Sequence, residues 1–309
     1  MQIPLTSSAS QTDLYSQRVN LVLDTIRTHL TDDLSIPTLA AIAGFSPYHF
    51  HRIFRVITGE TLADCVLRLR LERAVALLKA SPKLSITEAA FASGFVSMAH
   101  FSRVFKQHFG MTARMWDRES PLKNSKNGQV LEGFPHYTQE ELSTTDWASR
   151  LIRRTLPAQT IATIRVERPY NNPTRIMRAY DRLWAWYMRR GGILADTTLY
   201  GVSQDDPEVT PLALCRFDWC LRVPSYWEGE GAIRVVTWPA YEIAAVPVQG
   251  DIWAVDQAWQ FLYNHWLPRS RYWPDNRPAM EIYRRQPSET GWSMEFDLEC
   301  AVPIVPFSP

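Results

Sequence analysis

The sequence contains no hydrophobic run long enough to cross a membrane and no cysteine pattern typical of a metal site. No apolar stretch reaches the roughly 18 residues that a membrane-spanning helix needs, and the first residues do not combine a basic start with an apolar core, as a secretory signal does. The four cysteines are scattered without paired spacing: Cys65, Cys215, Cys220 and Cys300. We therefore expect a cytoplasmic protein with free buried thiols, no membrane contact and no cofactor.

An excess of charge of one sign is also absent. The chain has 33 Lys+Arg against 32 Asp+Glu, and hydrophobic residues make up 46%, the ordinary balance of a globular protein. The charge is uneven, because residues 1–120 carry a net +3 and residues 121–309 a net −2. Tryptophan is more uneven, since only Trp116 of the 12 precedes residue 121. Two halves of different composition suggest two different functions.

A polar segment separates the two halves. Residues 119–149 lack sustained hydrophobic periodicity, which argues against a long helix or strand there. They include residues that break regular elements: Pro121, Gly128, Gly133 and Pro135. We therefore expect this organisation: a first domain at 14–118, a linker at 119–150 with a short helix around Gln139–Leu142, and a second domain at 151–309.

The first half contains an internal repeat. LSIPTLAAIAGFSPYHFHRIFRVITGET (34–61) recurs as LSITEAAFASGFVSMAHFSRVFKQHFGMT (84–112). In each copy a short helix ends at a glycine, Gly44 or Gly94, which can adopt the left-handed conformation that a tight turn requires. A second helix follows with an apolar stripe at helical spacing, and Ser46 can cap it in the first copy. The repeat therefore predicts two helix-turn-helix units.

The second helix of each copy exposes basic and aromatic side chains opposite its apolar stripe. These side chains are Tyr48, His51, Arg52 and Arg55 in the first copy and His100, Arg103 and Lys106 in the second. A helix that presents arginine and histidine after a glycine turn is typical of a helix-turn-helix recognition helix. The alternative is a helical bundle whose basic side chains are only solvated. The matching positions of Arg52 and Arg103 in the two copies argue against it.

The segment between the copies supports this interpretation by its length. Residues 61–80 contain no Gly or Pro and predict one helix about 30 Å long. Major-groove faces on one side of B-DNA lie about 34 Å apart. The predicted rod could therefore place two recognition helices in adjacent major grooves, so that one chain reads an asymmetric double-stranded site without dimerising.

The first half resembles the DNA-binding domain of the AraC/XylS family of transcription regulators. The matching residues are Leu39, Ala40, Ala43, Gly44, Phe45, Ser46, Ala89, Gly94, Phe95, Phe101, Arg103, Phe105, Lys106, Phe109, Gly110 and Trp116. The resemblance implies an all-α DNA-binding domain that acts with RNA polymerase, usually as an activator. It also adds Met98 and Ala99 to the base-facing side chains. The family's stress regulators have glutamines at several of these positions, so we expect a different target sequence here.

The second half contains a weaker repeat over residues 159–305. Ile161–Ile164 is echoed by Ile243–Val246, and in each copy a helix and then two strands follow, which predicts a duplicated α+β domain. An extra strand, Ile233–Trp238, leads into the second copy. Alternation gives each strand two faces. We expect the apolar faces to pack on the two helices, and the opposite faces to line a groove with these residues: Asp218, Glu281, Tyr283, Glu295 and Asp297.

This half resembles the GyrI-like (SbmC-type) effector-binding domain, which occurs in multidrug sensors and follows an AraC-type domain in Rob-like regulators. The matching residues are Arg168-Pro169-Tyr170, where the family has Gly-Pro-Tyr, and Asp205-Asp206-Pro207, Phe217-Asp218, Glu281, Tyr283 and Pro287-Ser288-Glu289-Thr290. The resemblance implies a site where Glu281 meets a cationic or polarised small molecule. The candidate effector-binding residues are Tyr170, Trp186, Trp253, Glu281 and Tyr283.

Glu281 also has a simpler explanation. A carboxylate among aromatic rings costs free energy unless it is paired. A flat cation would pair it and gain about 0.5–2 kcal/mol of cation–π attraction from each ring. Without the resemblance, a salt bridge to one of four arginines is favoured: Arg216, Arg222, Arg284 or Arg285.

Two further functions stay open for the second half. Glu281 and Tyr283 could act as general base and acid in a hydrolase of reactive small molecules, or the half could be a protein-interaction module. The residue patterns indicate no obvious core shared by the two domains, and they leave open how a signal crosses the linker.

Overall fold

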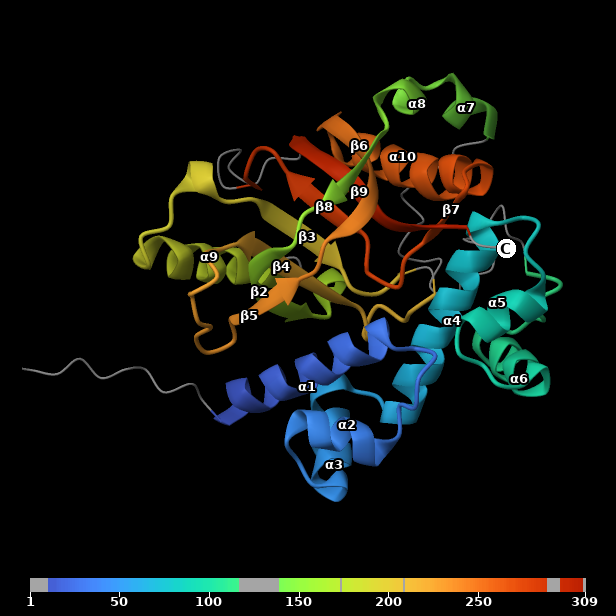
Figure 1. Cartoon of the computed structure of the whole chain (residues 1–309), viewed down its shortest axis with the longest axis horizontal. Coiled ribbons are helices and arrows are strands. Elements are labelled where there is room, and N and C mark those ends of the chain that lie inside the picture. The colour runs from blue at the N-terminus through green and yellow to red at the C-terminus, as the bar shows by residue number, and fades with distance from the viewer. Residues whose placement is uncertain (1–10, 117–138, 173, 208, 288–294, 308–309) are drawn as a thin grey trace, which may run out of the picture.

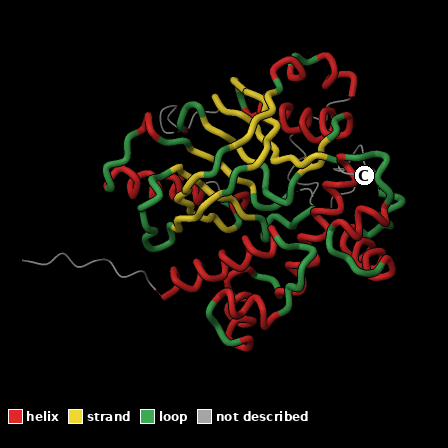
Figure 2. Tube along the Cα trace, viewed as in Figure 1, coloured by secondary structure: helices red, strands yellow, loops and turns green. Residues whose placement is uncertain are grey.

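The computed structural model describes residues 11–116, 139–172, 174–207, 209–287 and 295–307. Figure 1 shows a helical half, coloured blue to cyan, beside a half that is built on one sheet, coloured green to red. Figure 2 shows the same division, with the strands confined to the second half. The predicted fold classes of the two halves are therefore confirmed.

The helical half consists of short helices joined by tight turns. The helices are α1 (Gln11–Thr28), α2 (Ile36–Ala43), α3 (Pro47–Thr58), α4 (Leu62–Ala80), α5 (Ile86–Ala92) and α6 (Met98–Phe109). The predicted Ser46 cap is confirmed, because its side chain accepts a hydrogen bond from the backbone N–H of His49 at 3.4 Å. Ser85 and Glu88 cap α5 reciprocally, at 2.8 and 3.1 Å. Local chemistry thus sets where these helices begin.

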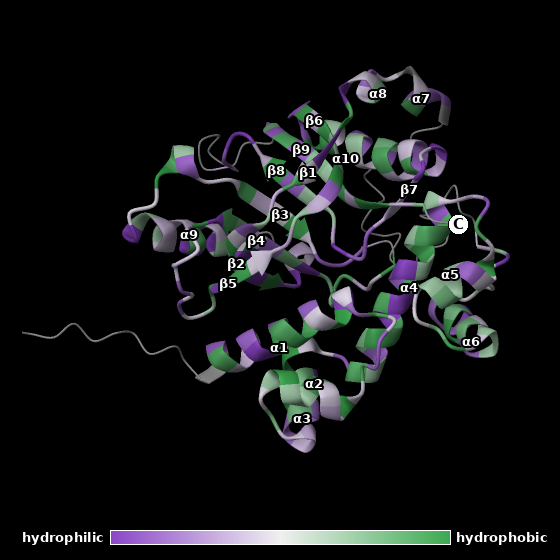
Figure 3. Cartoon of the chain, in the orientation of Figure 1, coloured by the Kyte–Doolittle hydropathy of each residue, from purple (hydrophilic) through white to green (hydrophobic). Residues whose placement is uncertain are grey.

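Two hydrophobic cores lie at opposite ends of α4. The first joins α1, α2, α3 and the first half of α4 around Phe50 and Phe54. The second joins the last half of α4 to α5 and α6 around Phe101 and Phe105. Figure 3 shows hydrophilic residues interrupting α4 near its middle, between these two apolar ends. The predicted rod is confirmed as a single helix that belongs to both units.

The second half is one antiparallel sheet with helices on it. Its strands are β1 (Ile152–Leu156), β2 (Gln159–Glu167), β3 (Leu199–Ser203), β4 (Arg216–Arg222), β5 (Arg234–Trp238), β6 (Tyr241–Gly250), β7 (Tyr272–Pro274), β8 (Met280–Tyr283) and β9 (Phe296–Pro306). Its α-helices are α7 (Gln139–Thr144), α8 (Trp147–Arg150), α9 (Thr174–Arg189) and α10 (Ile252–Gln260). The 3₁₀ turns are η3 (Pro169–Asn171), η4 (Leu194–Asp196) and η6 (Leu267–Arg269), and η5 (Phe261–Trp266) is a π-helix that follows α10 directly. Both predicted copies and the extra strand β5 are present.

The strand order shows how the two copies join. The order is β1-β6-β9-β8-β3-β4-β2-β5, with β7 on β9, so β3 of the first copy pairs with β8 of the second at the centre. α9 packs on β2 and β4, whereas α10 packs on β6 and β9. The two helices thus cover the flanks of one face of the sheet and lie to either side of the central strands.

Part of the predicted linker packs on the second half. α7, which confirms the expected short helix, and α8 place Leu142 and Trp147 in the core beneath α10. The Trp147 indole N–H donates to Gln257 of α10 at 3.1 Å. Residues 117–138 of that linker lie outside the described residues. All four cysteines are free and buried, as predicted.

The expectation that the halves share no core is wrong. Val209, from the loop between β3 and β4, is buried in the second core of the helical half, and Trp273 of β7 packs against it. Ala80 at the end of α4 is buried with α10. A loop residue such as Val209 belongs to no periodic pattern, so alternation could not reveal its burial. Among the described helices, none has the length and apolar character that a bilayer span requires.

Candidate nucleic-acid interface and small-molecule site

The two predicted recognition helices, α3 and α6, lie at the two ends of α4. Figure 1 places them on the outer side of the helical half, with α1 and α4 between them and the sheet. Most of the predicted DNA-facing side chains are exposed: Tyr48, His51, Arg52, Arg55, Ala99, Arg103 and Lys106. Met98 packs partly against the second core, and the half-buried His100 ring lies edge-on to Phe95 at 5.8 Å. The structure thus leaves both helices a free polar face.

The charge on these faces is of one sign. Neither α3 nor α6 contains an acidic residue, and within the described residues no carboxylate forms an ion pair with Arg52 or Arg103. The N-terminal end of each helix adds the positive end of its dipole. Such a surface attracts a polyanion and leaves two guanidinium groups available to a ligand.

Two of the five predicted small-molecule residues, Glu281 and Tyr283, lie together at the centre of the sheet. Gly201 of β3 pairs with Trp219 of β4 on one side and with Glu281 of β8 on the other. Side chains at directly paired positions share a face, so Trp219 and Glu281 point to the same side. Tyr283 lies two residues after Glu281, and its hydroxyl donates to the Glu281 Oε2 at 2.7 Å. We call Gly201, Phe217, Trp219, Glu281 and Tyr283 the Glu281 site.

Gly201 allows these side chains to converge. A Cβ at this position would lie 2.9 Å from Cζ of Phe217, 3.1 Å from Oε2 of Glu281 and 3.3 Å from Cε2 of Tyr283. The Trp219 ring lies 5.4 Å from that of Tyr283 and 5.0 Å from that of Phe217. Aromatic rings and one carboxylate therefore meet above a residue without a side chain.

Glu281 carries no compensating charge in the part of the chain that the structure describes. The arginines that could pair with it bind elsewhere or lie exposed: Arg216 binds Asp205, Arg222 binds the carbonyl of Asp196, Arg284 binds Glu299, and Arg285 is exposed. Burial raises the pKa of Glu281 above its usual value, although the hydrogen bond from Tyr283 opposes the shift. The geometry thus argues against the salt bridge and leaves a half-buried carboxylate ready for a cation.

The predicted division of the sheet faces is wrong for β8, although the apolar faces of β4 and β9 pack on α9 and α10 as predicted. We expected Asp218 beside Glu281, but Asp218 lies on the other face, where Arg165 binds both of its oxygens at 2.7 Å. Glu281 and Tyr283 instead share the face of Phe217 and Trp219. The prediction assumed that helices cover one whole face, whereas α9 and α10 cover only its flanks. Glu295 and Asp297 lie at another pocket, near Asp251 at the start of α10.

The other candidate effector residues occupy different surroundings. Trp186 is 1% exposed and packs in the core beneath α9 against Trp227, so it offers no surface to a ligand. Trp253 is 41% exposed at the start of α10. Tyr170 is also 41% exposed.

Sequence reasoning missed several residues at this site. The candidate effector residues did not include the half-buried Phe217 or the buried Trp219. They also did not include Tyr180 of α9, whose ring lies 5.5 Å from that of Trp219 and whose hydroxyl donates to Gln286 at 2.8 Å. Trp184 stacks on Tyr180 with ring centroids 6.2 Å apart. The available signal was Gly201, a glycine within a strand, which indicates close approach of other groups. Within the described residues, no cluster of His, Cys, Asp or Glu could hold a metal ion.

Arg168 stands where the family pattern has glycine, and its backbone explains the preference. It is the non-glycine residue with positive φ among those described, with φ 56° and ψ 53°. The left-handed region costs a residue with a Cβ about 1–2 kcal/mol. A Cβ on Gly59, at the end of α3, would lie 3.7 Å from the Arg168 guanidinium. The strained residue therefore reaches the helical half.

Arg168→Gly is expected to raise the free energy of unfolding by up to about 1 kcal/mol, because glycine adopts this conformation without strain. Urea unfolding of the full chain measures the change. Arg175→Gly, within the helix α9, is the control and should lower stability instead. A loss of stability in Arg168→Gly would show that its side-chain contacts outweigh the backbone strain.

Comparison with known proteins finds relatives for each half. Residues 39–119 match a helix-turn-helix domain family, and residues 153–304 match the GyrI-like small molecule binding domain. The "Probable transcription factor PqrA" of Proteus vulgaris is 36% identical over 114 residues, which cover 36% of this chain and 86% of PqrA. The "HTH-type transcriptional regulator GlxA" of Rhizobium meliloti (strain 1021) is 41% identical over 99 residues, and the match covers 32% of this chain and only 30% of GlxA.

A solved structure aligns with both halves at once. The "Cryo-EM structure of EcmrR-DNA complex in EcmrR-RPo" covers 87% of this chain and 98% of its own, at 13% identity and a TM-score of 0.44. The crystal structure of the EcmrR C-terminal domain covers 50% of this chain and 97% of its own, at 14% identity and a TM-score of 0.42.

Proposed function

We propose a function from one premise: the chain belongs to the AraC-type family of helix-turn-helix transcriptional regulators and carries a GyrI-like small-molecule binding domain after its DNA-binding region. It is a DNA-binding transcriptional regulator. We propose that it reads one asymmetric site as a single chain, with α3 and α6 in adjacent major grooves. We propose further that a lipophilic, cationic small molecule binds at the Glu281 site and changes this DNA binding.

One observation carries the proposal for DNA: two exposed arginines lie at matching positions on helices at opposite ends of one continuous helix, and neither has an ion-pair partner among the described residues. α4 has 19 residues and is about 28 Å long, against about 34 Å between successive major-groove faces. Arg52 and Arg103 can each bind O6 and N7 of a guanine, which is worth about 1–3 kcal/mol of base discrimination. The neighbouring base contacts come from Tyr48, His51, Met98, Ala99 and His100. Arg55 and Lys106 contact the phosphate backbone of the DNA.

Arg52→Ala and Arg103→Ala should each relax base preference in a separate part of one site. The site is first selected from a random DNA library with the wild-type chain. Dissociation constants for that site and its single-base variants then measure the loss, which we expect to be about 5- to 150-fold at one base pair. Lys83→Ala, an exposed cation outside both recognition helices, is the control. An equal loss across all sequences would make either arginine a phosphate contact.

One observation carries the proposal for the ligand: the half-buried Glu281 carboxylate lies among Phe217, Trp219 and Tyr283 without an ion-pair partner in the described residues. An aromatic cation would supply the missing charge and stack on the partly exposed rings of Phe217 and Tyr283, with the buried Trp219 behind them. We further propose that the regulator acts in the cytoplasm as an activator in contact with RNA polymerase. The AraC-type DNA-binding region supports this part of the proposal.

A hydrolase remains the second candidate because of one contact. The Tyr283 hydroxyl and the Glu281 carboxylate are 2.7 Å apart, a distance at which an acid and a base can share a proton. The relatives are transcriptional regulators, which favours binding over turnover. Turnover of an electrophilic small molecule by the wild-type chain, lost in Glu281→Gln, would favour the hydrolase instead.

A further inference from the structure

The loop between β3 and β4, described at residues 204–207 and 209–215, connects two strands that contribute Gly201 and Phe217 to the Glu281 site. At its start, Asp205 lies four residues after Gly201, about 13 Å of extended chain. At its end, Arg216 directly precedes Phe217, the residue whose ring approaches Gly201. Successive strand residues point to opposite faces, so Phe217 faces the Glu281 site while Arg216 faces the helical half. A shift of the β4 backbone at Phe217 would therefore move Arg216, whose side chain binds Asp205.

Asp205 is the centre of a buried ion network between the two halves. Its Oδ1 binds Nη2 of Arg216 at 2.6 Å, Nη1 of Arg68 at 2.9 Å and Nη2 of Arg27 at 3.2 Å. Burial would raise the pKa of Asp205, but Arg216 and Arg68 hold it well below its usual range. Because Arg68 belongs to α4 and Arg27 to α1, one carboxylate of the sheet half binds two helices of the DNA-binding half.

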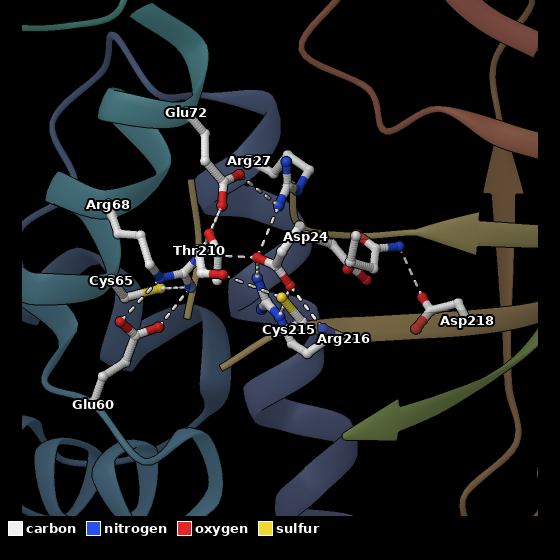
Figure 4. Close-up of polar contacts among 12 residues, drawn as sticks. Asp24, Arg27, Glu60, Cys65, Arg68, Glu72, Thr210, Cys215, Arg216 and Asp218 are labelled. Carbon is white, nitrogen blue, oxygen red and sulfur yellow. Dashed lines mark hydrogen bonds and ion pairs between the residues drawn. The ribbon is translucent and has the colours of Figure 1, made fainter. Parts of the chain in front are cut away.

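The positive and negative charges of the network around Asp205 are balanced, and its hydrogen bonds are directional. Arg68 also binds Glu60 at 2.6 Å and Glu72 at 3.0 Å, and the Thr210 hydroxyl donates to Glu72. Figure 4 shows Arg68 and Glu72 of α4, Arg27 of α1 and Thr210 and Arg216 of the sheet half converging, with Glu60 from the turn before α4. Positive and negative side chains thus offset one another, which a buried cluster requires. Hydrogen bonds depend on angle, whereas apolar contacts do not, so the network fixes one placement of the loop on α1 and α4.

The same loop also contacts the second helix-turn-helix unit. Val209 is 4% exposed in the core beneath α6, and its carbonyl oxygen accepts a hydrogen bond from Nε2 of His108 in α6 at 2.8 Å. Pro211 and Leu214 line an open cavity of about 460 Å³ together with Arg103, a predicted base contact. The loop therefore contacts the parts that hold both recognition helices.

We propose that the β3–β4 loop couples ligand binding at the Glu281 site to the relative placement of α3 and α6. The coupling rests on the proposed function. A ligand that displaces Phe217 or the β3 backbone moves the loop ends, Asp205 transmits the shift to α1 and α4, and Val209 transmits it to the core of α6. The ligand thereby changes how well the two recognition helices match the spacing of their DNA site.

The first test measures spacing and uses no ligand. The full chain binds the selected DNA site and the same site with one base pair inserted between its two contacted segments. Arg27→Gln removes the ion pair between α1 and Asp205 of the loop. Val209→Ala removes part of the packing of the loop in the core beneath α6. The measured quantity is the ratio of the dissociation constants for the two sites. In each variant this ratio should be about fivefold smaller than in the wild-type chain.

Two matched controls remove similar contacts inside the sheet half. Arg154→Gln breaks an ion pair with Glu299, which keeps Arg284 as a second partner. This matches Arg27→Gln, in which Asp205 keeps Arg68 and Arg216. Val223→Ala truncates another valine, 6% exposed, in the core beneath α9. Both controls should discriminate between the two sites as the wild-type chain does. Each variant is checked for a folded state by thermal unfolding, and if one fails to fold the other decides.

The second test adds tetraphenylphosphonium, a lipophilic aromatic cation, and follows its binding by tryptophan fluorescence. At saturation the probe should change the DNA dissociation constant of the wild-type chain about fivefold or more. The change should fall below about twofold in Arg27→Gln and Val209→Ala, with probe binding in the absence of DNA unchanged.

The outcomes separate the two proposals. Wild-type spacing discrimination and a wild-type response to the probe in both variants would overturn the coupling. A wild-type chain that binds the probe without any change in DNA affinity would overturn it too. Failure of the probe to bind would overturn the cationic-ligand part of the proposed function, and the spacing measurement would still decide the role of the loop.

Discussion

Gly94→Ala is expected to lower the free energy of unfolding by about 2–5 kcal/mol. Gly94 has φ +88°, and a Cβ there would lie 2.3 Å from the carbonyl oxygen of Leu30 and 2.8 Å from Nε of Arg70. The Leu30 carbonyl is backbone, and it accepts a hydrogen bond from that same Arg70 Nε at 2.9 Å. Neither neighbour can move without breaking the contact between the end of α1 and α4, so backbone strain and overpacking add.

Gly44→Ala is the matched control, because Gly44 ends the turn of the first repeat copy as Gly94 ends that of the second. Its φ is +66°, but a Cβ there would meet only the Arg18 side chain at 3.6 Å, an ordinary contact. We expect a loss of about 1–2 kcal/mol from the backbone conformation alone. Urea unfolding of both full-length variants measures the difference. Equal losses would show that the Leu30 contact relaxes without cost.

The two glycines also show where a sequence repeat stops being informative. The repeat predicted both turns because each depends on local chemistry, a glycine at the end of one helix and a serine cap on the next. It could not distinguish Gly44 from Gly94, because α1 has no second copy, and the Leu30 carbonyl that follows α1 lies close to Gly94, whereas the atoms near Gly44 belong to the Arg18 side chain. Helix limits and recognition faces were predictable, whereas the packing between the units was not.

The sheet half was predictable in its elements and not in its faces. Alternation correctly predicted that β4 and β8 are strands. It could not show which side of β8 lies toward the helices, because the charged side chains of this sheet also have partners within the fold. Asp218 is paired with Arg165 on the face toward α1, where Asp24 joins them. The network around Asp205 was equally inaccessible, since Arg68 and Asp205 lie 137 residues apart in a helix and an aperiodic loop.

Glu281→Gln is expected to weaken binding of tetraphenylphosphonium about 10- to 100-fold, which corresponds to roughly 1.4–2.8 kcal/mol. The amide keeps the size of the side chain but removes the charge that would pair with the cation. Tryptophan fluorescence titration measures the dissociation constant. Glu295→Gln, an exposed carboxylate in the same half, should change nothing. Triphenylphosphine oxide, an aromatic probe without charge, should bind the wild-type chain and Glu281→Gln equally. If Glu281→Gln binds both probes more weakly, the substitution has disturbed the aromatic rings.

The same substitution should make the ligand-free protein more stable. Burial raises the pKa of Glu281 above its ordinary value of 4.5, so the folded state holds the proton more tightly than the unfolded state. The ionised carboxylate is therefore destabilising above the raised pKa, and this penalty disappears as the pH falls below 4.5. At neutral pH, Glu281→Gln should gain about 1 kcal/mol in the free energy of unfolding.

That gain should shrink toward zero in acid, where Glu281 is itself neutral, and Glu295→Gln should show no such trend. Urea unfolding across the pH range measures both. If Glu281→Gln is more stable than the wild-type chain and binds tetraphenylphosphonium more weakly, the Glu281 charge destabilises the ligand-free fold and serves cation binding. A less stable variant at neutral pH would mean that the ionised carboxylate, with its bond from Tyr283, serves the fold itself.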